Sequence, residues 1–210
     1  MNIMDKLLTF WFETRDLTEP VEERDIWFKT ELAFDAAIRD QFLQVCEAAM
    51  AGKLDKPKDD AAGCLPLGLL LDQCPRNLFR HTAQAYAADA RTLEVACHAL
   101  AEGYDADVSP RHVAFFYLPF EHNEDLANQN VSVALFSCLG IASSLEAAEG
   151  HRDAIARFGR FPYRNNAVGR TSTQDKKFLK DPPPWVKTRA EIDAMQRQKD
   201  GPKVTKDTAT

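Results

Sequence analysis

The residues from His151 to Thr173 hold the most distinctive set of chemical groups in the chain. They include a single acid, Asp153, and no lysine, but five arginines: Arg152, Arg157, Arg160, Arg164 and Arg170. A site chosen only for positive charge would accept lysine equally well, whereas the planar fork of arginine suits carboxylate and phosphate groups. The stretch therefore predicts an arginine-rich loop that binds a small anionic molecule or an acidic peptide end.

Lysine and arginine are distributed unevenly along the whole chain. All twelve lysines lie outside residues 59–175, and the same stretch contains nine arginines. Because lysines occur on both sides of it, a general preference for arginine is a poor explanation. We expect many of the central charges to be partly buried and paired with acids, where arginine is the better cation.

Two acidic clusters earlier in the chain are candidate partners for these arginines. In the first, DQCPRN, Asp72 stands near the end of an apolar helix, where the helix dipole disfavours a carboxylate. A buried acid there needs a cationic or hydrogen-bonding partner, and Arg76 and Asn77 follow within the same cluster.

The second cluster, EHNED, surrounds His122 with acids. Glu121, Glu124 and Asp125 are expected to share one face at the start of a helix over residues 121–139. Acids are favourable at a helix start, but three of them emerging from an aromatic helix suggest a demand for arginine or a metal ion.

The arginine-rich stretch is divided by Gly159. Before it, His151 shares a helical face with Ile155 and Phe158, so we expect the imidazole to point inward. After it, the segment RFPYRNNAVGR is predicted to be a loop, and loops of this kind carry function more often than helices do.

These groups allow two interpretations, which the sequence leaves open. In the structural one, an ion-pair network inside a polar core joins the arginines to the acids, and such networks are the more frequent cause of these clusters. In the functional one, the groups line a cleft in which one or two arginines remain available to a phosphate or carboxylate. The candidate ligand-binding residues are Asp72, Arg76, Asn77, Glu121, His122, Asp125, His151, Arg157, Arg160, Arg164 and Asn165.

An enzyme is the second hypothesis, with Glu121 or His151 as general base beside an arginine-bound phosphate or carboxylate. A metal site is disfavoured, because a helical Glu-x-x-His is absent and the neighbouring arginines oppose a cation. The sequence contains no local Ser-His-Asp or Cys-His signature and no glycine-rich phosphate loop, and we expect no cofactor.

Composition narrows the class of protein. The formal net charge of −6 argues against a nucleic-acid partner, which would require a basic excess. No stretch reaches the roughly 18 apolar residues of a membrane span, so we expect no membrane partner. The five cysteines are odd in number and widely spaced, which favours buried thiols over disulfides or zinc. We therefore expect a cytoplasmic protein, of an oligomeric state that the sequence does not indicate.

The apolar spacing predicts an all-α protein, and its helices must position these groups. The predicted helices cover residues 4–13, 34–51, 64–73, 84–102, 110–118, 121–139 and 141–158, with a last short helix at 172–179. Cys74 is expected to leave the helical conformation because Pro75 follows it. The helix with Leu65 and Leu67 is apolar on every side, which predicts that it is buried all round.

The links between the predicted helices are short, which indicates antiparallel neighbours in a bundle or in a stack of helix pairs. No sustained alternation of apolar and polar residues predicts a strand. We expect a single helical domain over residues 1–181, followed by a proline-rich, charged and mobile tail over residues 182–210.

Three segments, in this order, resemble the bacterial domain-of-unknown-function family number 924: LLDQCPRN, YLPFEHNEDLANQ and HRDAIARFGRFPYRN. The resemblance covers about Asp5 to Leu179. It implies antiparallel helix pairs in a tetratricopeptide-like (TPR-like) α-α superhelix, and it implies no activity. The positions that match the family are Asp72, Arg76, Glu121, His122, Asp125, His151, Arg157, Arg160, Arg164 and Asn165.

The chain departs from the family at three places. Cys74 stands where phenylalanine is favoured, Tyr163 where histidine is common, and Lys56-Pro57-Lys58 where a tryptophan is expected. Tyr163 weakens any proposal that a loop histidine is catalytic. The repeat-like fold adds a third hypothesis, a protein-interaction adaptor, beside the anion-binding scaffold and the enzyme.

Overall fold

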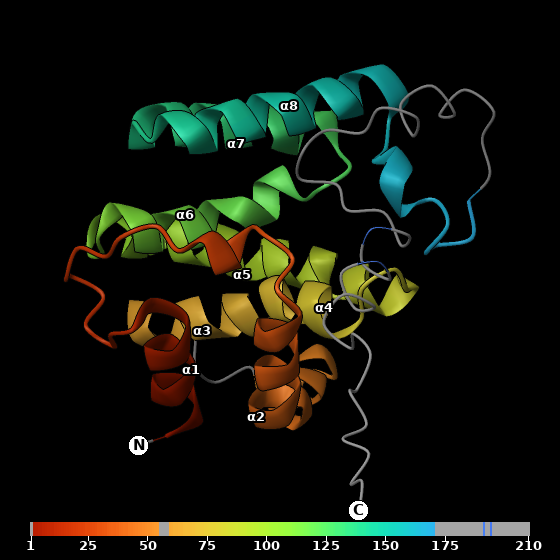
Figure 1. Ribbon diagram of the computed structural model, residues 1–210. Coiled ribbons are helices and arrows are strands. Elements are labelled where there is room, and N and C mark those ends of the chain that lie inside the picture. The colour runs from red at the N-terminus through yellow and green to blue at the C-terminus, as the bar shows by residue number, and fades with distance from the viewer. Residues whose placement is uncertain (1, 55–58, 171–190, 192–193, 195–210) are drawn as a thin grey trace, which may run out of the picture.

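The computed structural model describes residues 2–54 and 59–170, together with Glu191 and Ala194. Within these residues the chain folds into helices and the segments that connect them, and none of them forms a strand (Figure 1). The all-α prediction is therefore confirmed, whereas the TPR-like arrangement stays a prediction. The helix predicted at 172–179 lies outside the described residues, and so does the tail from residue 182, except for Glu191 and Ala194.

The α-helices are α1 (Ile3–Phe12), α2 (Leu32–Met50), α3 (Ala61–Leu71), α4 (Gln73–Leu78), α5 (Asp89–Ala101), α6 (Pro110–Glu121), α7 (Leu126–Leu139) and α8 (Ala142–Phe158). Short 3₁₀ helices lie between or after them: η1 (Asp25–Trp27), η3 (Ala83–Tyr86), η4 (Tyr104–Ala106) and η5 (Pro162–Arg164). None of the helices in the described ranges combines the length and the hydropathy that crossing a bilayer would require.

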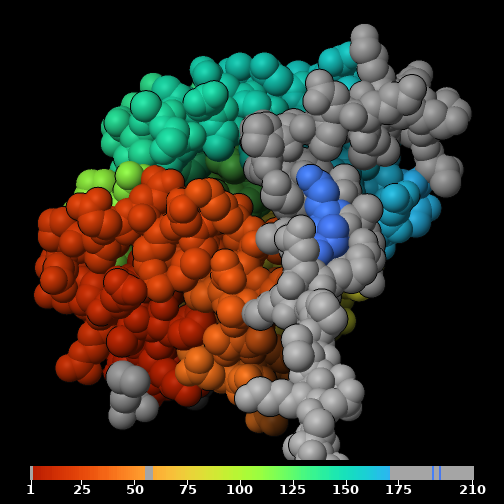
Figure 2. Space-filling view, in the orientation of Figure 1, coloured from red at the N-terminus to blue at the C-terminus, as the bar shows by residue number. Residues whose placement is uncertain are grey.

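The helices stack in layers (Figure 1). The α7–α8 pair forms one outer layer and packs on α6, which packs on α5, which packs on α3. Helices α1 and α2 form the opposite side and also contact α3. In the face that Figure 2 shows, the atoms of α1 and α2 (red to orange) lie below the α7–α8 layer (teal).

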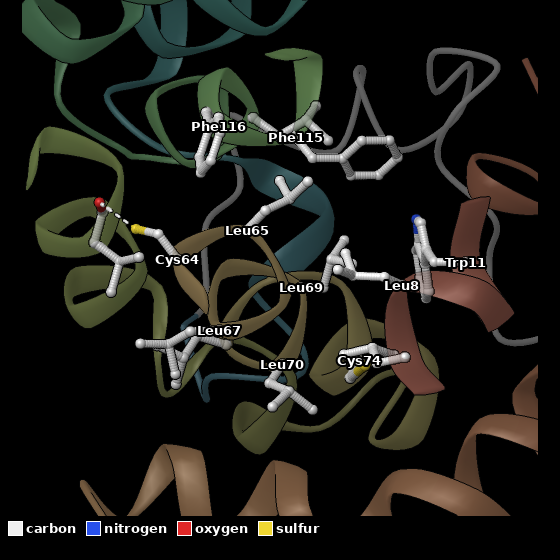
Figure 3. Close-up of a cluster of buried hydrophobic side chains, with 14 of the residues drawn as sticks. Leu8, Trp11, Cys64, Leu65, Leu67, Leu69, Leu70, Cys74, Phe115 and Phe116 are labelled. Carbon is white, nitrogen blue, oxygen red and sulfur yellow. Dashed lines mark hydrogen bonds between the residues drawn. The ribbon is translucent and has the colours of Figure 1, made fainter. Parts of the chain in front are cut away.

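Helix α3 lies at the centre of this stack, in contact with α1, α2, α5 and α6. Its side chains project in all directions, with Leu65 near Phe115 and Phe116 of α6, and Leu69 near Leu8 of α1 (Figure 3). The leucines of α3 are at most 1% exposed, which confirms the predicted burial on every side. A helix can be apolar all round only where each side has such a neighbour.

Several observed boundaries differ from the predicted ones, and two of these differences move acidic residues. Helix α5 begins at Asp89 rather than at residue 84, because residues 83–86 form the separate 3₁₀ helix η3. Helix α6 continues through Pro119 to Glu121, although proline lacks an amide hydrogen. Burial of the aromatic residues before and after Pro119 outweighs this loss, and α7 begins only at Leu126.

Candidate functional site

Asp72 occupies the break between α3 and α4. Helix α3 ends at Leu71 and α4 starts at Gln73, so Pro75 falls in the first turn of α4, where a missing amide hydrogen costs no helical bond. The predicted end of the helix near Gln73 is thus confirmed, but the prediction that Cys74 is non-helical is wrong. Asp72 is only 2% exposed, so its carboxylate needs partners.

The partners of the Asp72 carboxylate come from three residues. The Gln73 amide donates to Oδ2 at 2.6 Å, and Arg76 Nη1 lies 3.0 Å from Oδ1. His122 Nδ1 lies 2.8 and 2.9 Å from the two carboxylate oxygens. Burial alone would raise the pKa of Asp72, but Arg76 and His122 outweigh it and hold that pKa well below its usual range. Asp72 is therefore an anion, and His122 donates its Nδ1 hydrogen to it.

This pairing determines the state of His122. Burial, and then the charge of Arg76, lower the pKa of His122, so the imidazole is neutral near pH 7. With the hydrogen on Nδ1, the opposite nitrogen Nε2 carries a lone pair. No described residue donates a hydrogen bond to Nε2, and His122 lines a cleft. An imidazole that a carboxylate orients through one nitrogen, in a residue that lines a cleft, is an arrangement that can accept a proton.

The contacts continue from Arg76 and return to His122, which closes a ring of five residues. Arg76 Nη2 lies 3.0 Å from Asp89 Oδ1, and Arg164 Nη1 donates to Asp89 Oδ2 at 2.8 Å. Arg164 Nη2 then donates to the carbonyl oxygen of His122 at 3.0 Å. Two carboxylates and two guanidinium groups alternate in this polar ring, so it is neutral overall. Its members come from the α3–α4 break, α4, α5, the α6–α7 link and η5.

Arg164 is enclosed by aromatic side chains. Its guanidinium carbon lies 4.5 Å from the ring centroids of both Tyr86 and Phe161, and 5.7 Å from that of Tyr163. Rings at this distance stabilise a cation, more strongly when water is excluded. Because only 5% of the Arg164 side chain is exposed, these contacts and Asp89 together hold the guanidinium rigidly.

Glu124 fastens both ends of the segment that follows α8. Its carboxylate accepts the backbone N–H of Phe161 at 2.8 Å. It also pairs with both terminal nitrogens of Arg170, at 2.7 and 2.9 Å. Burial would raise the pKa of Glu124, but these hydrogen bonds lower it below its ordinary value, so the group is ionised.

These elements surround a cleft of about 430 Å³. Two carboxylates and two guanidinium groups lie in its wall, beside a neutral imidazole and a phenol. The lining residues are Tyr86, Asp89, His122, Asn123, Glu124, Arg164, Val168 and Arg170. The described residues contain no group of three or more His, Cys, Asp or Glu side chains arranged to hold a metal ion.

The two candidate general bases, Glu121 and His151, are buried and do not line the cleft. His151 Nδ1 donates to the carbonyl oxygen of Ala147 at 2.8 Å and lies 3.2 Å from Glu121 Oε1. Burial, helped by the charge of Asp72, raises the pKa of Glu121 to about 8. Burial, followed by the neighbouring His122, lowers the pKa of His151 to about 3. Near pH 7 the two groups form an uncharged pair behind the polar ring.

The expectation that three acids share one helical face is wrong. Glu121 is the last residue of α6, Glu124 lies in the link, and Asp125 is the residue before α7. Asp125 is exposed, and its carboxylate accepts the N–H groups of Ala127 and Asn128 at 2.8 and 3.1 Å. It is therefore the N-cap of α7, a structural role.

The remaining predicted site residues lie outside the cleft lining. Asn77 is half-buried, and its amide donates to the carbonyl oxygen of Gln73 at 2.9 Å. Arg157 is exposed with its guanidinium over the Phe158 ring, Arg160 is half-buried, and Asn165 is buried, with its backbone oxygen accepting from the N–H of Arg170.

Of the predicted ligand-binding residues, the structure brings Asp72, Arg76, His122 and Arg164 together. The sequence interpretation missed Asp89, which it placed in the middle of a helix, and it did not select Glu124 or Arg170 as ligand-binding residues. The available signal for Asp89 was its acidic character at a helix start, which the merged helix at 84–102 concealed.

Comparisons with known proteins agree with this fold and add no activity. Residues 7–183 match a family described as "Bacterial protein of unknown function (DUF924)". The fold is similar to a solved structure of a protein of unknown function, ATU0120 from Agrobacterium tumefaciens, with 38% sequence identity and a TM-score of 0.77. That match covers 85% of this chain and 97% of the other. No curated protein matches the chain.

Proposed function

This chain belongs to the bacterial family of unknown function DUF924, and we propose that its cleft is an active site in which His122 acts as general base. The observation that carries the proposal is the Asp72–His122 pair. Asp72 fixes the hydrogen of the imidazole on Nδ1, which leaves the Nε2 lone pair directed away from Asp72, in a residue that lines the cleft. The lowered pKa of His122 supports the same role, because a base must be unprotonated before it reacts.

The substrate class that fits the cleft is a small molecule with a carboxylate or phosphate group. Arg164 and Arg170 line the cleft, and the planar fork of arginine suits such anions. In a hydrolysis, His122 Nε2 takes a proton from water, the resulting hydroxide attacks the acyl or phosphoryl centre, and Nε2 returns the proton to the leaving group. Asp72 stabilises the imidazolium that exists between the two proton transfers.

The test is turnover of a panel of carboxylic esters and phosphate monoesters by the full chain. We expect His122→Gln to lower kcat/KM for any active substrate by about 100-fold or more, the usual contribution of a general base. His98→Gln is the matched control, because His98 lies on α5 outside the cleft lining. Equal turnover by the wild type and His122→Gln would contradict the proposal.

A second candidate function is an anion-binding scaffold without chemistry. The observation that favours it is that two guanidinium groups, those of Arg164 and Arg170, line one cleft. A rise in melting temperature with phosphate or carboxylates, with no turnover across the panel, would favour this scaffold over the enzyme. The cytoplasmic location and the adaptor role stay predictions.

A further inference from the structure

The two arginines of the cleft differ in how much of each a ligand can reach. The Arg164 side chain is 5% exposed, and its terminal nitrogens are bonded to Asp89 and to the carbonyl oxygen of His122. The Arg170 side chain is 33% exposed, and that of its partner Glu124 is 27% exposed. A molecule that enters the cleft therefore meets the Glu124–Arg170 pair, whereas Arg164 is enclosed.

The geometry of the Glu124–Arg170 pair is that of a bound anion. The two carboxylate oxygens lie 2.7 and 2.9 Å from the two terminal nitrogens of Arg170, the fork pairing that arginine makes with carboxylates and phosphates. Glu124 is held separately by the N–H of Phe161 at 2.8 Å, so it keeps one anchor when Arg170 turns away. Partly exposed ion pairs are weak, because water competes for both charges.

We propose that Arg170 is the anion subsite of the cleft and that Glu124 is its internal competitor, which an incoming carboxylate or phosphate displaces from the guanidinium. This inference rests on the proposed binding of an anionic molecule in the cleft. It adds where the anion lies and what limits its affinity. The anionic group of the ligand occupies the Arg170 fork, and the reacting group lies at His122 in the same cleft.

The charges of the residues that line the cleft predict how anion binding responds when one of them is removed. Asp89 and Glu124 balance Arg164 and Arg170, so the lining carries no net charge. Removing the charge of Glu124 leaves the lining at +1 and ends the competition of this carboxylate for the fork of Arg170. An acid whose loss strengthens anion binding is a competitor, whereas an acid that only supports the fold does not strengthen binding when it is lost.

The experiment measures the affinity of the full chain for inorganic phosphate and acetate by calorimetry at low ionic strength. We expect Glu124→Gln to bind phosphate about fivefold more tightly than the wild type, and Arg170→Met to bind it about fivefold more weakly. Glutamine still accepts the Phe161 N–H, so the anchor is retained. Glu149→Gln, an exposed change on α8, controls for the altered net charge.

Three results would overturn the subsite: Glu124→Gln binding no tighter than Glu149→Gln, Arg170→Met binding as the wild type does, or no phosphate binding by either the wild type or Glu124→Gln. If Glu124→Gln does not fold, Glu124→Asp provides a second comparison, because its shorter side chain withdraws the carboxylate from the fork while the net charge of the lining stays the same. His122→Gln separates the two proposals. If His122→Gln keeps turnover while Glu124→Gln binds phosphate more tightly, the general base is wrong and the subsite stands. If His122→Gln loses turnover while Glu124→Gln binds phosphate no more tightly, only the subsite is overturned.

Discussion

Helix α3 and the break that follows it lie a few residues apart in the chain, but their buried side chains require opposite surroundings. Leu65 and its neighbours are buried against four other helices and require only apolar surroundings of the right volume. Asp72 is just as buried, yet it requires Arg76, Gln73 and His122 at fixed distances. Many apolar side chains could pack against Leu65, whereas only a few groups could pair with the Asp72 carboxylate. The polar ring should therefore respond more sharply to single changes.

The largest loss in the free energy of unfolding is expected from Asp72→Ala. It leaves Arg76 and His122, whose side chains are 17% and 13% exposed, without their shared carboxylate, and breaking a largely buried pair in this way costs about 4 kcal/mol. Chemical denaturation near pH 7 measures the free energy of unfolding. Asp125→Ala is the matched control, because it removes an exposed N-cap and should cost only about 1 kcal/mol.

A somewhat smaller loss is expected from Leu65→Ala in the apolar core. Leu65 is fully buried, and truncating such a leucine costs about 3 kcal/mol through lost transfer energy and a residual cavity. Leu126→Ala, at an exposed position of α7, should change the free energy of unfolding far less. If Leu65→Ala proves clearly more costly than Asp72→Ala, the contrast between the two regions is the reverse of our expectation.

The smallest expected change in the free energy of unfolding, and the only increase, comes from Glu121→Gln. The pKa of Glu121 is about 8 in the folded chain against an ordinary value of 4.5, so the unfolded chain loses this proton first. Stability from this group is complete at low pH and is lost as pH rises from about 5 to 8. Glutamine cannot ionise, so Glu121→Gln should gain on the order of 2 kcal/mol over the wild type between these pH values.

Unfolding free energies of both proteins at pH 5 and at pH 8 measure this gain. Glu146→Gln, an exposed change on α8, is the control and should show no such pH dependence. A parallel pH response of the wild type and Glu121→Gln would contradict the raised pKa, because Glu121 would then ionise alike in the folded and the unfolded chain.

The sequence predicts the helices well because each is specified by local signals. Serine and proline mark the start of α6 at Ser109 and Pro110, and Gly140 and Gly159 end α7 and α8 with φ angles of 74° and 66°. The errors lie where tertiary contacts outweigh local rules. Pro119 lies inside a helix because its neighbours are buried, so the start of α7 moves to Leu126.

The site is less predictable, because its residues are paired across long stretches of sequence. The sequence predicts that arginines of the last third pair with the two acidic clusters. Arg170 does pair with Glu124, whereas Arg164 pairs with Asp89, which belongs to neither cluster. The identity of Asp89 could not be predicted, because nothing local distinguishes it from any acid at a helix start. His122 was selected as a ligand-binding residue, but its orientation depends on Asp72, which lies 50 positions away.

The positions of the ring residues along the chain also determine when the polar ring can close during synthesis. Four members of the ring, Asp72, Arg76, Asp89 and His122, precede α7, whereas Arg164 follows α8. A nascent chain that has left the ribosome only as far as α8 therefore lacks the guanidinium that joins Asp89 to the His122 carbonyl. The Asp72–His122 pair can form on such a partial chain, but the wall of the cleft is completed only when the segment after α8 emerges and docks.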